Sequence, residues 1–172
     1  MAVLPIHIYP DPVLRVRCPE VELFDAELKE LAGSMVETMH AAPGIGLAAS
    51  QVGVELRLAV VDVTAGESDE EIHVFVNPEI VDWTGKETEE EGCLSIPGIT
   101  EKVIRPASIR VRAMALDGNA FEISADGLFA RAICHEIDHL DGVLFVDRLV
   151  GLRKERVRRQ LKRLGRQQEM IA

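Results

Sequence analysis

Aromatic residues are scarce in this 172-residue sequence, at 4% of the chain, and long apolar runs are missing altogether. No stretch reaches the roughly 18 apolar residues that a membrane-spanning helix needs, so we expect no membrane association. The N-terminal stretch MAVLPIHIYPDPVL has no basic region and is interrupted by prolines, unlike a secretory signal. Only three cysteines occur, too few and odd in number for a disulfide framework. We therefore expect a cytoplasmic protein with reduced thiols.

Charge is abundant and unevenly distributed along the chain. Hydrophobic residues at 47% and charged residues at 28% are ordinary values for a folded domain. From Arg148 to the end, nine Lys and Arg residues stand against two Glu, a net charge of +7, whereas residues 1–147 hold 10 basic and 27 acidic residues, a net charge of −17. We expect a main domain over 1–147 and a basic C-terminal helix over 148–172, packed on or extending from that domain.

Apolar residues recur at helical spacing in three segments. The first runs from Asp25, a plausible N-cap, to His40, and the second from about Asp126 to Leu140, with Gly142 as its stop. The third runs from about Val150 to Arg166, with Val150, Val157, Leu161 and Leu164 on one face. The sequence therefore predicts an N-terminal, a central and a basic C-terminal helix.

Short β-branched segments predict strands between the first two helices, at 58–63, 73–76, 109–114 and 120–124. No helix-length insert separates most of them, which favours antiparallel pairing over parallel crossovers. The predicted fold class is α+β, with short antiparallel strands packed around the central helix.

The central helix carries the stretch AICHEIDHLDG, which contains the H-E-x-x-H pattern of zinc peptidases at His135, Glu136 and His139. Residues four apart on a helix project within about 40° of each other, so both imidazoles can reach one metal ion. Glu136 falls within an apolar arc of this helix. A carboxylate in such surroundings needs a partner or a raised pKa, and a general base at neutral pH requires the latter.

Two histidines do not hold a catalytic metal alone, so a third ligand is needed. The extended zinc-peptidase motif would place a histidine where Phe145 stands, and no histidine follows His139. Cys134 projects away from the two histidines and is better read as a packed thiol, and Cys18 has no site-like neighbours. Cys93, in the stretch EEEGCLSIPG, is flanked by glycine and proline and is expected on a turn that presents its thiol.

Two other classes of zinc protein also use histidine and cysteine or carboxylate ligands, and both are disfavoured here. A metallopeptidase that cuts peptide bonds is disfavoured because the downstream ligand is missing. A structural zinc domain is disfavoured because four protein ligands close such sites, whereas here three candidates and a free Glu136 are found.

A glycine-rich stretch, GIGLAASQVG over 44–53, lacks the lysine of a phosphate-binding loop and the glycine spacing of a dinucleotide site. Its small residues allow a ligand or a neighbouring strand to approach the backbone closely. Gln51 adds a side-chain amide that can donate to an oxygen. Taken alone, the stretch fits a tight helix-to-strand connection equally well.

These three stretches together resemble the peptide deformylase family, whose motifs are G-x-G-x-A-A-x-Q, E-G-C-L-S and H-E-x-D-H. They stand here at 44–51, 91–95 and 135–139, in the family's order, and the resemblance covers essentially the whole chain. It implies that Cys93, His135 and His139 hold one divalent metal ion. It also implies a metal-dependent hydrolase that removes the formyl group from the initiator methionine of nascent polypeptides and releases formate.

The resemblance assigns roles to further residues. A divalent cation lowers the pKa of water to supply hydroxide. We expect this hydroxide to attack the formyl carbon while Glu136 takes the proton and passes it to the leaving amine. The Gln51 amide and the backbone N–H of Leu94 would meet the developing oxyanion.

The substrate would lie along the glycine-rich stretch and the cysteine strand. By the family pattern, Gly46 with the backbones of Ile45 and Gly92 would line the formyl-methionyl peptide, and Leu128 would help form the methionine pocket.

Two residues depart from the family pattern. Cys134 stands where the family often has Gln, and Arg131 lies one turn before His135, where an apolar pocket residue would be expected. The resemblance therefore leaves the shape of the methionine pocket open. Glu91 and Arg105 are candidates for an ion pair close to the metal ligands.

The resemblance also implies a working metal, a partner and a location. Cysteine and two histidines suit Zn²⁺ on ligand grounds, but the family implies Fe²⁺ as the working metal, with Zn²⁺, Ni²⁺ or Co²⁺ in a purified sample. We expect no other cofactor. Because the family acts at the ribosome, the basic C-terminal helix is expected to bind ribosomal RNA, in a bacterial cytoplasm or an organelle.

Overall fold

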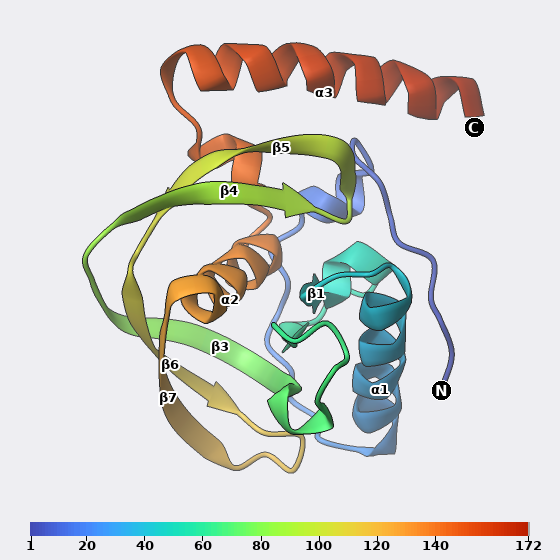
Figure 1. The fold of residues 1–172 in the computed structure, drawn as a ribbon. Helices are drawn as coiled ribbons and strands as arrows, with labels where there is room; N and C mark the ends of the chain where they lie inside the picture. Colours follow the sequence, from blue (N-terminus) through green and yellow to red (C-terminus); the bar gives the residue numbers. More distant parts are fainter. Residues whose placement is uncertain (172) are drawn as a thin grey trace.

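A central helix, α2 (Gly127–Leu140), lies between a five-stranded sheet and a two-stranded hairpin in the computed structural model, which describes residues 1–171 (Figure 1). The sheet has the order β1-β2-β3-β6-β7, and all its pairs are antiparallel, as predicted. Its strands are β1 (Gly46–Ala48), β2 (Leu58–Val61), β3 (His73–Thr84), β6 (Ser108–Met114) and β7 (Ala120–Asp126). The α+β class is confirmed. No helix among residues 1–171 is both long and apolar enough to cross a membrane.

The inner strand β2, whose sequence is Leu-Ala-Val-Val, is apolar throughout because both of its faces are buried. Successive side chains of a strand point to opposite faces, and helices cover both faces here. Leu58 and Val60 pack in the cluster formed with α1 (Ala26–Ala41), whereas Ala59 and Val61 pack in clusters that include residues of α2. A strand that is buried on both faces therefore positions the two helices relative to each other.

Helix α1 begins and ends close to its predicted bounds. The side chain of Asp25 caps it, accepting a 3.0 Å hydrogen bond from the backbone N–H of Leu28. Met35 and Met39 are fully buried on its inner face. The chain then passes through residues 42–45 into β1, so the packing of α1 positions the glycine-rich stretch.

The hairpin of β4 (Glu87–Cys93) and β5 (Ile96–Arg105) lies outside the sheet and was not predicted as strands. The sequence suggested a turn on both sides of Cys93. In the structure Cys93 is the last residue of β4, and Pro97 and Gly98 belong to β5. The register shifts between Glu91 and Cys93, and this irregularity brings Cys93 opposite Ile96 at the end of the hairpin.

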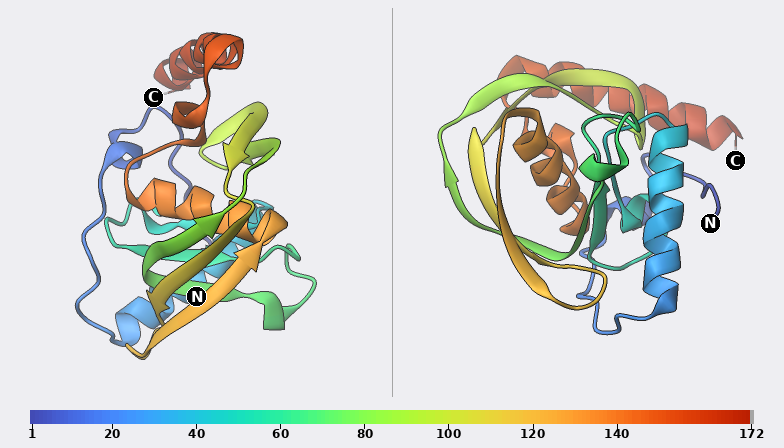
Figure 2. Two further views of the ribbon diagram at one scale, coloured as in Figure 1. Left: turned by 90° about the vertical axis from the view of Figure 1, so that its left-hand side faces the viewer. Right: turned by 60° about the horizontal axis from the view of Figure 1, so that its bottom comes forward.

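Helix α3 (Gly151–Ile171) lies across the outer side of the hairpin, away from α2 (Figures 1 and 2). Val157 and Leu164 are buried in a cluster with Ile96, Ile99 and Val103 of β5. Two details of the predicted helix were wrong. Val150 precedes α3 and is 71% exposed, and the helix continues beyond Arg166.

Short 3-10 turns complete the described chain. They are η1 (Pro12–Arg15), η2 (Ala49–Val52), η3 (Asp69–Glu71) and η4 (Phe145–Arg148). Of these, η2 carries Gln51 toward the hairpin, and η4 leads from α2 to α3 beneath the hairpin's apolar side.

Candidate metal centre

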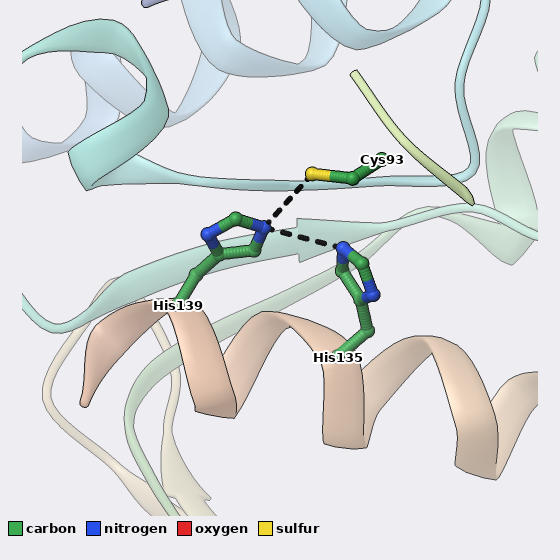
Figure 3. Close-up of side chains that lie close together, drawn as sticks. All are labelled: Cys93, His135 and His139. Carbon is green, nitrogen blue, oxygen red and sulfur yellow. Dashed lines mark hydrogen bonds between the residues drawn. The ribbon is translucent and has the colours of Figure 1, made fainter. Parts of the chain in front are cut away.

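Three potential ligand atoms converge between α2 and the end of β4 (Figure 3). The Nε2 atoms of His135 and His139 are 3.2 Å apart, and the Sγ atom of Cys93 lies 3.2 Å from His139 Nε2. Both histidines are buried and Cys93 is half-buried. This is the one group of three His, Cys, Asp or Glu side chains among residues 1–171 that could hold a metal ion. A thiol and two imidazoles facing one point fit a divalent transition metal.

The local structure explains how these atoms meet. Residues 135 and 139 lie one turn apart on the same face of α2, which ends at Leu140, before Gly142 adopts a positive φ of 73°. Burial lowers the pKa of His139, and the charge of the neighbouring His135 lowers it further. A lowered pKa favours the neutral imidazole, the form in which histidine binds a metal.

Glu136 lies beside this group and has an unpaired oxygen. Its side chain is 4% exposed, its Oε2 atom has no hydrogen-bond partner, and burial raises the pKa of its carboxyl group to about 7. This agrees with the raised pKa expected from its apolar surroundings on the helix. The backbone of β1 approaches it so closely that a Cβ atom on Gly46 would overlap the Glu136 carboxylate. A buried carboxyl group with a pKa near 7 can accept and return a proton at neutral pH.

Gln51 and Leu94 lie beside the thiol of Cys93 and line the same cleft. Gln51 is oriented by its own oxygen, which accepts a 2.9 Å hydrogen bond from the backbone N–H of Ala48. Its Nε2 atom donates to Ser95 Oγ at 3.1 Å and lies 3.7 Å from Cys93 Sγ. Leu94 directly follows Cys93 in the turn of the hairpin and lines the same cleft.

The cleft itself has a volume of about 380 Å³. Residues of the glycine-rich stretch, the β4 strand and α2 line it, and they include Ile45, Gly46, Gly92 and Leu128. Leu128 is 55% exposed and lies at the rim. The fold thus brings nine of the ten candidate residues to one cleft, with His139 buried directly behind it.

A buried charge network surrounds Glu91, next to the ligands. Glu91 Oε2 accepts from Arg105 Nη2 at 2.7 Å and lies 2.7 Å from His135 Nδ1, so the expected ion pair is confirmed. Burial alone would raise the pKa of Glu91, but hydrogen bonds from His135 and Arg105 lower it to about 2. Glu91 thereby orients the ring of His135 so that its Nε2 atom faces the other ligands.

Sequence reasoning missed the rest of this network. Arg105 also donates to Asp138 on α2, at 2.5 Å, and Asp138 in turn accepts from Arg148 at 2.7 Å. Arg131 donates to Glu91 Oε1 at 3.2 Å. Asp138 lies three residues after His135 on the ligand-bearing helix, and this spacing was the signal that could have found it.

The other two cysteines lie outside the ligand group. Cys134 is 4% exposed within an apolar cluster, and burial raises the pKa of its thiol to about 11. Cys18 is 2% exposed and packs with Leu140. The packed thiol predicted for Cys134 is confirmed, and Cys18, which has no site-like neighbours in the sequence, is also buried.

Comparisons with known proteins agree on one family. The family model described as polypeptide deformylase matches residues 3–155. A peptide deformylase of Acinetobacter baumannii (strain SDF) is 51% identical over 171 residues, covering 98% of this chain and 96% of that protein. The crystal structure of a peptide deformylase from Legionella pneumophila matches with a TM-score of 0.89 and 44% identity, covering 98% of each chain. A peptide deformylase of Arabidopsis thaliana, crystallised with an inhibitor, matches with a TM-score of 0.93 and 38% identity over 98% of this chain and 94% of that one.

Proposed function

The chain belongs to the polypeptide deformylase family, and from that premise we propose how its own residues share the reaction. The protein is a metal-dependent hydrolase that removes the N-formyl group from nascent polypeptides. The proposal concerns the residues that perform this step, the metal and the partner. The observation that carries it is the unpaired, buried carboxylate of Glu136 beside the convergent Cys93, His135 and His139.

In this proposal Cys93, His135 and His139 hold one divalent ion. When bound, the ion supplies hydroxide at neutral pH by lowering the pKa of water. We propose Fe²⁺ as the working metal and Zn²⁺, Ni²⁺ or Co²⁺ as substitutes, because a thiolate with two imidazoles suits all four. No other cofactor is needed for hydrolysis of an amide.

Glu136 is proposed as the proton carrier. It takes a proton from the attacking water and delivers it to the amine that leaves the formyl carbon, so formate and a free N-terminus are the products. The pKa of about 7 places the carboxyl group where both transfers are feasible at neutral pH.

Gln51 and Leu94 are proposed as the donors for the oxyanion. The Gln51 amide has its oxygen engaged by the backbone N–H of Ala48, and its Nε2 atom donates to Ser95 Oγ at 3.1 Å and lies 3.7 Å from Cys93 Sγ, so this donor is held beside the thiol. The backbone N–H of Leu94 follows the thiol in the hairpin turn. Loss of one such donor typically costs about 10² to 10³ in rate.

The peptide is proposed to lie between the Ile45–Gly46 backbone and Gly92, with its methionine side chain toward Leu128. All four residues line the cleft. We further propose that residues 1–147 form the catalytic domain and that the predicted C-terminal extension over 148–172 is appended to it through α3; residue 172 lies outside the described residues.

A substitution of Glu136 tests the central role. Glu136→Ala should retain one metal ion per chain after anaerobic purification but lose about 10² to 10⁴ in turnover of a formyl-methionyl peptide, measured by formate release. Glu122→Ala, which removes an exposed carboxylate on β7, should leave turnover unchanged. Near-normal turnover in Glu136→Ala would contradict the role, and release of acetate from an acetyl peptide would contradict selectivity for formyl.

Helix α3 is proposed to bind ribosomal RNA, which places the enzyme in a bacterial cytoplasm or an organelle. Its apolar residues Val157 and Leu164 face the hairpin, while Arg159, Lys162 and Arg166 are exposed. Because the body is acidic, this helix is the part of the chain that anionic RNA attracts.

Neutralising α3 tests this partner. Replacing Arg159, Lys162 and Arg166 with Ala should weaken ribosome binding. It should also reduce the slope of the logarithm of the binding constant against the logarithm of salt concentration, by about one for each phosphate contact removed. The matched control replaces Lys29, Arg110 and Arg112 with Ala on the body. Equal salt slopes for the two triple variants would overturn the proposal.

A further inference from the structure

Two buried arginines connect α2 to the hairpin, and they cross in opposite directions. Arg105 extends from β5 to Asp138 on the helix, whereas Arg131 extends from the helix to the hairpin. Arg105 and Arg131 are 4% and 5% exposed, and the Arg131 side chain also lines the cleft, one turn before His135. Arg131 thus stands where the family resemblance suggested an apolar pocket residue.

The guanidinium of Arg131 binds mainly to backbone. Its Nη1 atom donates to the carbonyl oxygen of Val103 at 2.9 Å, and its Nη2 atom donates to the carbonyl oxygen of Glu87 at 3.0 Å. Val103 belongs to β5 and Glu87 to β4, so one planar group binds both strands near the open end of the hairpin. Two further contacts of Nη1 are longer, to Glu91 Oε1 at 3.2 Å and to the carbonyl oxygen of Glu89 at 3.5 Å.

Glu91 does not depend on Arg131 for its charge balance. It already accepts from Arg105 Nε at 3.0 Å and Nη2 at 2.7 Å, and from His135 Nδ1 at 2.7 Å. What Arg131 adds is the fixed position of two backbone carbonyls relative to α2. A guanidinium is suited to this because its donors form a rigid fork, whereas a lysine ammonium is a single point.

The cleft has its floor on α2 and one wall on β4, so its width depends on the distance between those two elements. We propose that Arg131 is a positioning residue that fixes the hairpin against α2 and thereby sets the size of the pocket for the methionine side chain. This rests on the proposed assignment of the cleft to that side chain. The Nη1 and Nη2 atoms of Arg131 donate to the hairpin, so the end of this side chain is directed toward the hairpin rather than toward an apolar substrate.

Selectivity between substrates tests this role, because a ratio of rates does not depend on the fraction of active enzyme. The probes are formyl-methionyl and formyl-alanyl peptides of otherwise equal sequence, with the metal-loaded full chain. Arg131→Met keeps the stem without the fork. It should raise KM for the methionyl peptide more than it lowers kcat, and should reduce the methionine-to-alanine ratio of kcat/KM about tenfold, because a loosened pocket discriminates size poorly.

Hydrogen exchange provides a readout that does not need turnover. Amides of β4 and β5 should exchange faster in Arg131→Met, while those of α1 should not change. Arg131→Lys keeps the charge but not the fork, so it should show the same direction of change and provides the test if Arg131→Met does not fold. The matched control is Arg148→Met, which removes an arginine from Asp138 without touching the hairpin backbone and should preserve the ratio and the exchange.

The possible outcomes distinguish the assignment of the cleft to the methionine side chain from the positioning role of Arg131. A wild-type enzyme with no preference for the methionyl peptide would overturn the assignment of the cleft, and with it this inference. A wild-type preference that survives unchanged in Arg131→Met and Arg131→Lys would overturn the role of Arg131 alone.

Discussion

The proposed metal ligands come from two regions of the molecule that are held in place by different interactions. The two histidines lie on α2, which packs against the five-stranded sheet through apolar side chains such as Ile133 and Val111. Cys93 lies on the hairpin, whose contacts with α2 include buried charges, chiefly Glu91, Arg105 and Asp138. The apolar side of the hairpin faces the other way, toward η4 and α3.

The two kinds of interaction have different consequences: apolar burial contributes folding stability, whereas buried hydrogen-bonded charges fix the positions of atoms. Apolar burial is non-directional and scales with the area removed from water, so it can hold α2 without fixing atoms to a fraction of an ångström. Buried ion pairs contribute little net stability because desolvation offsets their attraction, but their hydrogen bonds have strict geometry. We infer that the sheet stabilises the site and that the charges position its cysteine.

The largest effect on stability is expected from removing the arginine that Glu91 and Asp138 share. Arg105→Met would leave both buried carboxylates with fewer partners, and breaking such a pair costs about 3 to 5 kcal/mol. Urea unfolding of the metal-free chain measures the loss. Arg15→Met is the matched control, because Arg15 pairs with Asp147 at the surface with 46% of its side chain exposed, where such a pair contributes about 0.2 to 1 kcal/mol. Equal losses in the two variants would contradict the comparison.

A slightly smaller loss of stability is expected in the apolar region, with a different signature. Leu58 is fully buried on β2, so Leu58→Ala should cost about 2 to 5 kcal/mol in urea unfolding. Leu58 takes no part in the charged contacts between α2 and the hairpin. The metal affinity of Leu58→Ala in native conditions should therefore stay close to that of the wild type, whereas Arg105→Met should bind metal more weakly. Parallel metal titrations measure both affinities, and weaker binding in Leu58→Ala would show that apolar packing also positions the ligands.

The same division explains what the sequence could predict. The helix periodicity of α1 and α2 and the apolar run of β2 are local patterns, so these elements and the two histidines were readable from spacing alone. The hairpin was not, because Glu87 to Glu91 are mostly polar and the strand is specified by pairing with β5 and by Arg131. Cys93 ranked ahead of the other two cysteines from its flanking residues and from the helical direction of Cys134, and the family resemblance then selected it as the ligand.

Side-chain contacts across the chain were the least predictable. Glu91 and Arg105 were paired correctly, but nothing in the spacing showed that Arg131 binds the backbone of both strands. Long side chains that cross between elements depend on how those elements pack, which no local pattern encodes. The raised pKa of Glu136 was predictable in direction because a helical position among apolar residues is a local property.

The smallest effect on stability, with a large effect on rate, is expected where β1 meets α2. A Cβ atom on Gly46 would overlap the carboxylate of Glu136, which can rotate away at little cost in folding free energy. The rotation would misplace the proposed proton carrier, and a displacement of about 1 Å can cost about 10² in rate. Gly46→Ala should therefore unfold near the wild-type urea concentration, but its kcat should fall about 10²-fold.

The matched control is Gly44→Ala. Its new Cβ atom would lie 2.7 Å from the Cδ1 atom of Leu94, a flexible apolar side chain of the hairpin, so the loss of kcat should be smaller. A larger loss in Gly44→Ala than in Gly46→Ala would show that the hairpin side of the cleft, rather than the sheet side, controls the position of the reacting groups.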